Sequence, residues 1–172
     1  LGGARIVGIP SNAQLGFDES RYVYDTSPFP KWSLCVTHSA LYRRAPDDLH
    51  ACPLCPAHAT KAAAAKRAAA EKTRFIQICA AGHMQDVDWS GIVSSMGGTC
   101  QGGCRPSHFE WCGGGGALRS VTIRCPNCGG SANLGQAYAR TWRCSGNFPE
   151  ERMGGSASPC AEPGSIVQRG AS

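Results

Sequence analysis

The chain has 172 residues, which suits one domain or two small modules. Eleven residues are cysteine, whereas only five are Phe, four Trp and four Tyr, so the composition predicts a thin apolar core that needs cross-linking. It excludes collagen, a coiled coil and a large α/β core. The formal net charge of +5 permits a nucleic-acid partner without requiring one. No apolar run approaches the roughly 20 residues of a membrane span, and no signal peptide is recognisable.

The N-terminal part combines short apolar alternations with several prolines. Residues 5–9 and 22–24 predict edge strands, and residues 31–58 predict a first zinc knuckle. We expect three units: residues 1–56 with the first zinc-ribbon module, a helix at 57–73, and a second zinc-binding module with two sites at 74–172. Because the chain opens at Leu1 and stops at Ser172 soon after an apolar pair, we also expect it to be a fragment of a larger protein.

Residues 57–73 are dominated by alanine, the strongest helix former, and predict a helix of about four turns. The segment has almost no apolar stripe beyond alanine, which favours a solvated spacer between zinc modules. The alternative is that its basic side chains face a phosphate backbone. Those candidate nucleic-acid contacts are Lys61, Lys66, Arg67 and Lys72.

The second half alternates short strands with glycine-rich loops. The apolar patterns predict strands at residues 74–79, 108–111, 118–124 and 166–167. Residues 82–89 predict a turn and then a short helix, where Asp86 and Asp88 either support a metal-bound His83 or cap the helix. Residues 131–140 predict a helix capped by Ser131 or Asn133, with Leu134, Ala137 and Tyr138 facing inward.

The cysteines occur in short-spaced pairs that are typical of zinc knuckles. Cys52 and Cys55 form one C-x-x-C pair, Cys125 and Cys128 form another, and Cys35 with His38 and Cys79 with His83 form mixed pairs. A gap of two or three residues lets one tight turn direct both side chains at a single ion. Zn²⁺ accepts mixed sulfur and nitrogen tetrahedra without redox chemistry.

Ten cysteines and two histidines divide into three sets of four, which predicts three Zn²⁺ ions. In chain order the sets are Cys35, His38, Cys52 and Cys55; Cys79, His83, Cys100 and Cys104; and Cys125, Cys128, Cys144 and Cys160. Cys112 is left over, and in the second set the fourth ligand could be Cys104, Cys112 or His108. The alternatives are disulfides, an iron–sulfur cluster on the third set, a redox C-x-x-C pair, and a catalytic zinc.

Catalytic constellations are missing from the sequence. It contains no metalloprotease, phosphate-loop, serine-hydrolase or zinc-deaminase signature. Cys112 has His108 four residues away, but a spare thiol is the simpler interpretation. We therefore expect a protein that is not an enzyme and has no small-molecule substrate.

Several motifs together resemble the DrmB family of the DISARM anti-phage defence system. They are Phe29-Pro-Lys-Trp-Ser-Leu-Cys35, the run from Arg74-Phe-Ile-Gln-Ile-Cys79 through Gly82-His83 to Asp88-Trp89, Cys125-Pro-Asn-Cys128, and Gln168-Arg-Gly-Ala-Ser172. The resemblance covers roughly residues 28–172. His38 stands where a second cysteine is usual, a change that zinc tolerates. Ser94 stands where a histidine is expected after the Trp, so that Cys100 and Cys104 could jointly replace that ligand, which leaves the second ligand set open.

The resemblance implies a non-catalytic, cytoplasmic scaffold that works with a helicase subunit and binds DNA. Arg124, Arg140 and Arg143 lie near the third ligand set and add candidate phosphate contacts. The alternatives are a purely protein-docking zinc module and, less favoured, a zinc hydrolase or redox enzyme. The expected fold is small, irregular, loop-rich α+β, with zinc-ribbon and knuckle modules joined by the alanine-rich helix.

Overall fold

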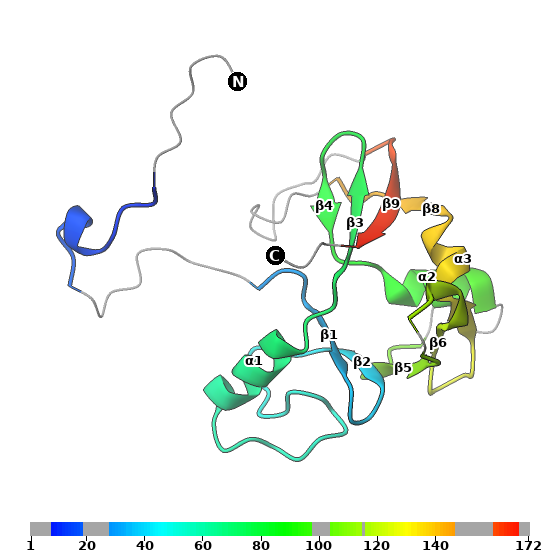
Figure 1. The fold of residues 1–172 in the computed structure, drawn as a ribbon, viewed down its shortest axis with the longest axis horizontal. Helices are drawn as coiled ribbons and strands as arrows, with labels where there is room; N and C mark the ends of the chain where they lie inside the picture. The colour runs from blue at the N-terminus through cyan, green and yellow to red at the C-terminus, as the bar shows by residue number, and fades with distance from the viewer. Residues whose placement is uncertain (1–7, 19–27, 98–103, 115, 147–159, 169–172) are drawn as a thin grey trace.

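The structure, a computed structural model, describes residues 8–18, 28–97, 104–114, 116–146 and 160–168. It is a small α+β arrangement of two antiparallel sheets with short helices, as the sequence predicted (Figure 1). The first sheet has the order β1-β2-β5-β6-β7 and the second the order β4-β3-β9-β8. Among the described residues, no helix is long and apolar enough to cross a membrane.

The five-stranded sheet combines strands from the first and the last of the three expected units. Its strands are β1 (Trp32–Cys35), β2 (Ala40–Arg43), β5 (His108–Cys112), β6 (Thr122–Arg124) and β7 (Ser131–Asn133). The early strand β2 pairs with the late strand β5, so that Leu41 lies opposite Phe109. Residues before 57 and after 73 therefore share one sheet, while the boundaries at 56 and 73 stay a prediction.

The four-stranded sheet places the last described strand in its middle. Its strands are β4 (Met84–Gln85), β3 (Phe75–Cys79), β9 (Pro163–Gln168) and β8 (Thr141–Arg143). β9 pairs antiparallel with both β3 and β8, which confirms the strands predicted at 74–79 and 166–167. β8 was not predicted, and Met84–Gln85 forms a hairpin strand rather than part of a turn.

One apolar core connects the two sheets and α2 (Trp89–Gly97). Fourteen buried residues from both sheets and the helices form it, and Trp89 is the largest of those that are fully buried. The Phe75 ring packs edge-on against Trp89 at 6.1 Å between ring centroids. The Asp88 carboxylate accepts a hydrogen bond from the Gly91 N–H at 3.0 Å, which confirms its predicted role as a helix cap. Asp86 instead accepts one from the Lys31 N–H at 2.7 Å.

The alanine-rich helix α1 (Lys61–Ala70) is shorter than predicted and is not a free spacer. Thr60 caps it by accepting a hydrogen bond from the Ala63 N–H at 3.1 Å. Ala64 and Ala68 are buried, and the Ser33 hydroxyl donates to the Ala68 carbonyl at 2.7 Å. The interpretation of α1 as a solvated spacer is therefore wrong for this face, because small side chains let the helix lie close to β1.

Two predicted elements change type partway along. The segment 118–124 begins as a 3₁₀ turn, η2 (Leu118–Ser120), and becomes strand β6 only at Thr122. The segment 131–140 begins as β7 and continues as the short helix α3 (Leu134–Tyr138). Asn133 caps α3, and Leu134 and Ala137 are buried as predicted, but Tyr138 is exposed.

At the N-terminal end, the described residues include the short 3₁₀ turn η1 (Ala13–Leu15). Ile9 is exposed and lies outside any strand. The rest of the strand predicted at 5–9, and the whole of the strand predicted at 22–24, fall outside the described residues.

Candidate metal centres

Three groups of cysteine and histidine side chains converge within the described residues. Within each group the ligand atoms all lie within 4.8 Å of one another. The groups are cluster 1 (Cys35, His38, Cys52 and Cys55), cluster 2 (Cys79, His83, Cys144 and Cys160) and cluster 3 (Cys104, Cys125 and Cys128). In each cluster, one pair of ligands comes from a tight connection between two antiparallel strands: β1–β2, β3–β4 or β6–β7.

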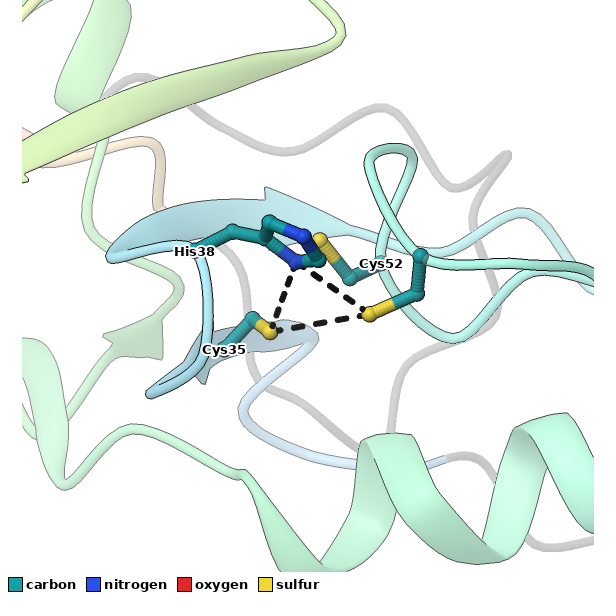
Figure 2. Close-up of side chains that lie close together, drawn as sticks. Cys35, His38 and Cys52 are labelled. Carbon is teal, nitrogen blue, oxygen red and sulfur yellow. Dashed lines mark hydrogen bonds between the residues drawn. The ribbon is translucent and has the colours of Figure 1, made fainter.

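Cluster 1 matches the ligand set predicted from the sequence. Cys35 ends β1, His38 lies in the β1–β2 turn, and Cys52 and Cys55 lie in the loop before α1. Figure 2 shows the side chains of Cys35, His38 and Cys52 pointing toward one another. The Leu54 N–H lies 3.4 Å from the Cys52 sulfur, so the backbone of the turn also donates to the thiolate.

The distances within clusters 1 and 2 fit a tetrahedral zinc ion. Zn–S bonds of about 2.3 Å and Zn–N bonds of about 2.0 Å place two sulfurs about 3.8 Å apart and a sulfur and a nitrogen about 3.5 Å apart. In cluster 1 the Cys35 and Cys55 sulfurs are 3.8 Å apart, and they lie 3.6 and 3.4 Å from His38 Nδ1. In cluster 2 the Cys79 sulfur lies 3.3 Å from His83 Nδ1. The donor sets therefore fit Zn²⁺.

Cluster 2 corrects the predicted division of the ligands. Cys79 and His83 flank the β3–β4 turn, where Gly82 adopts the left-handed conformation with φ of +86°. Their partners are Cys144, which follows β8, and Cys160, which precedes β9, rather than Cys100 and Cys104. The Gly146 N–H donates to the Cys144 sulfur at 3.4 Å, as at Cys52.

Cluster 3 combines the C-x-x-C pair of the β6–β7 turn with Cys104, which precedes β5. Cys104 was predicted to belong with Cys79, and Cys144 and Cys160 with Cys125, so both assignments are wrong. Cys100 lies outside the described residues. Neither alternative ligand joins a described cluster: the His108 ring lies by the Ser107 hydroxyl at 3.1 Å, and Cys112 lies near Arg124.

These contacts also bear on two of the chemical alternatives, disulfides and an iron–sulfur cluster. None of the ten described cysteines forms a disulfide, so the disulfide alternative is wrong for the described part of the chain. The four-cysteine set proposed for an iron–sulfur cluster does not assemble, because its members divide between clusters 2 and 3.

The cysteine of each mixed Cys/His pair has a lowered thiol pKa, whereas three other cysteines of these clusters have raised ones. Burial raises the pKa of Cys35, but hydrogen bonds from His38 and the Thr37 backbone outweigh it and leave the pKa at about 7. Cys79 also has a pKa of about 7, because hydrogen bonds from His83 outweigh desolvation. Burial raises the pKa of Cys52 to about 12 and raises those of Cys55 and Cys144. A bound cation would supply the charge that the buried thiolates need.

The Arg67 guanidinium contacts cluster 1 and a carboxylate, and it is therefore not an unpaired cation available to a phosphate. Its guanidinium lies 3.8 Å from the Cys35 sulfur and donates to the Glu71 carboxylate at 3.1 Å. Glu71 also accepts the Tyr42 hydroxyl at 2.7 Å, and burial followed by this hydrogen bond raises the pKa of Tyr42. Tyr42 and Glu71 thereby hold the Arg67 guanidinium beside the sulfur of Cys35, a candidate metal ligand.

The other predicted nucleic-acid contacts have varied surroundings. Lys61 forms an ion pair with Asp47 at 2.8 Å, and Arg124 forms one with Glu110. Lys72 is half-buried, and burial lowers its pKa. Lys66, Arg140 and Arg143 are exposed. The structure does not gather the seven on one element: four lie on or next to α1, and three lie on β6, β8 and the turn before β8.

Sequence reasoning missed two features beside the clusters. Val36, between Cys35 and His38, and Leu54, between Cys52 and Cys55, are 80% and 48% exposed. Their positions between paired ligands are the sequence signal that could have identified them as turn tips. A cavity between the sheets is lined by Trp111 and Phe75. No local pattern predicts it, because its walls come from distant segments.

The fold and the clusters define a small α+β protein with three candidate Cys/His metal sites. Residues 9–172 match a family described as a domain of unknown function (DUF8724), and the chain belongs to that family. The comparison with curated proteins found no match. The comparison with solved structures found none either.

Proposed function

We propose that the protein is a zinc-stabilised, non-catalytic scaffold in a bacterial anti-phage defence complex, where it partners a helicase subunit and contributes to DNA binding. The observation that carries this proposal is the set of three Cys/His clusters, two of which have four ligands each. The resemblance of the Cys79–Trp89 region to the DrmB family supplies the defence complex and the helicase partner.

A structural rather than catalytic role for zinc is supported by the ligand count. Clusters 1 and 2 each offer four protein ligands, which leaves no open position on a tetrahedral ion for water or substrate. Most of their cysteines are buried, at strand ends and in the connecting loops. Free cysteines at these positions also suit a reducing compartment, which supports a cytoplasmic location. The proposal includes no small-molecule substrate.

DNA binding is supported by the net charge of +5 and by exposed cations outside the ion pairs of the described residues, chiefly Lys66, Arg140 and Arg143. Phosphate contacts of this kind make affinity fall steeply with salt. Three such cations make only part of a DNA-binding surface, and in this proposal the helicase subunit supplies the rest.

The test has two parts. Mass spectrometry of the native protein should find three zinc ions per chain. Fluorescence anisotropy with labelled DNA, at two salt concentrations and with the helicase subunit present, should show salt-dependent binding that weakens when Lys66, Arg140 and Arg143 are changed to Glu. A matched Arg43→Glu variant serves as the control. Unchanged DNA affinity in the triple variant would overturn the DNA role.

A purely protein-docking module is the second candidate function, and the exposed turn tips of cluster 1 favour it. Val36 and Leu54 present apolar side chains to solvent from turns that a metal would hold rigid. A Val36→Ser, Leu54→Ser variant should then lose the protein partner in a pull-down while keeping three zinc ions. Leu15→Ser, an exposed apolar position on η1, is the control.

A further inference from the structure

A cavity of about 310 Å³ lies where the two sheets approach each other. Its walls come from β1, the segment entering β3, β5, the loop leading into η2, and the end of β9. Ligand pockets span roughly 300–1,000 Å³, so this cavity has room for one small ring-bearing group and not for a folded segment. It is separate from the three metal clusters, since it contains none of their ligands.

Part of the lining of the cavity is aromatic. Trp111 and Phe75 line it with ring centroids 6.2 Å apart and planes inclined by 33°. Leu34 and Leu118 extend the apolar surface, and Trp111 is only partly buried. A flat ligand that enters this space would lie against the indole of Trp111.

The charged residues that line the cavity are both basic. Lys72 and Arg74 both line it, and no acidic residue does. Arg74 is exposed, whereas Lys72 is half-buried and is held by a backbone bridge to Ser33. The acidic group that acts on the pKa of Lys72 is Asp86, whose carboxylate accepts a hydrogen bond from the Lys31 backbone. Charge complementarity therefore selects a ligand with an anionic group next to its planar part.

We propose that this pocket takes one unstacked nucleotide of a single DNA strand, with its base against Trp111 and its phosphate at Lys72 and Arg74. Gln168 also lines the cavity, and its amide is the group we assign to the edge of the base. Stacking on an aromatic ring tolerates any base, so the pocket gives strand recognition without sequence preference. This inference rests on the proposed DNA-binding function.

The test uses the full, zinc-loaded chain and two probes of equal length and charge. One probe is a labelled short oligothymidylate, and the other is an abasic oligonucleotide. Wild-type protein should bind the first about tenfold more tightly, because only that probe has bases to stack. This arm needs no protein variant and so does not depend on whether a variant folds.

The variants locate the effect. Trp111→Leu should remove the preference for the probe with bases, while Trp111→Phe keeps most of it. Lys72→Gln with Arg74→Gln should weaken both probes and reduce the slope of log affinity against log salt by about 0.7 for the one phosphate lost. Arg43→Gln, an exposed arginine on β2 that does not line the cavity, is the matched control.

The outcomes separate the two proposals. Binding that is equal for both probes, or that is unaffected by the pocket variants, overturns the nucleotide pocket and leaves DNA binding standing. Absence of binding to either probe, with and without the helicase subunit, overturns the proposed DNA role and this inference with it. Preference for a free mononucleotide over the strand would replace the DNA strand by a small ligand.

Discussion

The Cys79 sulfur lies 3.9 Å from the Cys160 sulfur, although 81 residues separate them in the chain. Cys79 ends β3 opposite Gly164 of β9, and Cys160 stands three residues before β9 begins. Gly164 has no side chain, and a Cβ there would collide with the side chain of Gln77. Cluster 2 therefore fixes the last described strand in the middle of its sheet.

The first prediction distinguishes this arrangement from the ligand sets expected in chain order. Cys144→Ser should lose one of three zinc ions, and Cys79→Ser with Cys144→Ser should still lose only one, because both cysteines belong to cluster 2. Cys125→Ser with Cys144→Ser should lose two. Zinc counted by mass spectrometry decides the matter. The reverse pattern for the two double variants would restore the grouping of Cys144 with Cys125.

Local features of the fold and the clusters could be predicted from the sequence. The strands around Phe75, Phe109 and Ile166 and the capping of α2 by Asp88 follow from short patterns. Each hairpin pair of ligands is also a local pattern, because one turn sets both side chains.

The pairing of hairpins with their second ligands could not be predicted in this way. Cys144 and Cys160 reach cluster 2 because β9 inserts between β3 and β8, which is a long-range arrangement. Cluster 1 was predicted correctly because its four ligands are close in the chain. The burial of Ala64 and Ala68 against β1 is likewise a tertiary contact that alanine-rich composition does not reveal.

The second prediction concerns metal removal. The smaller core around cluster 1 consists of Cys35, Ala40, Tyr42, Ala51, Cys52, Cys55 and Ala68, and it contains no Leu, Ile, Val or Phe. The larger core holds most of the bulky apolar side chains. A chelator should therefore increase hydrogen exchange in β1, the β1–β2 turn and α1 sooner and further than in α2. The reason is that burial of apolar area contributes little stability to the smaller core around cluster 1. Equal exposure of both regions would contradict this.

The third prediction reassigns Arg67. Arg67→Gln removes the guanidinium beside the Cys35 sulfur and the partner of Glu71, so it should weaken zinc binding at cluster 1 by about tenfold. Lys66→Gln, on the neighbouring exposed position, should leave zinc affinity unchanged. Competition with a colorimetric chelator measures both. If Arg67→Gln changed only the DNA affinity, the original view of Arg67 as a phosphate contact would be right.

The fourth prediction concerns the completion of cluster 3, for which the structure describes three sulfurs. Cys100 precedes Cys104 by four residues, a spacing that suits a pair of zinc ligands, and we expect it to be the fourth ligand. Cys112 is the matched control, since it lies near Arg124 and belongs to no described cluster. Cys100→Ser should lower the zinc content from three to two per chain, or should loosen the third ion enough for a weak chelator to remove it. Cys112→Ser should retain all three. The opposite result would assign the third site to Cys112 and would require β5 to shift toward the β6–β7 turn.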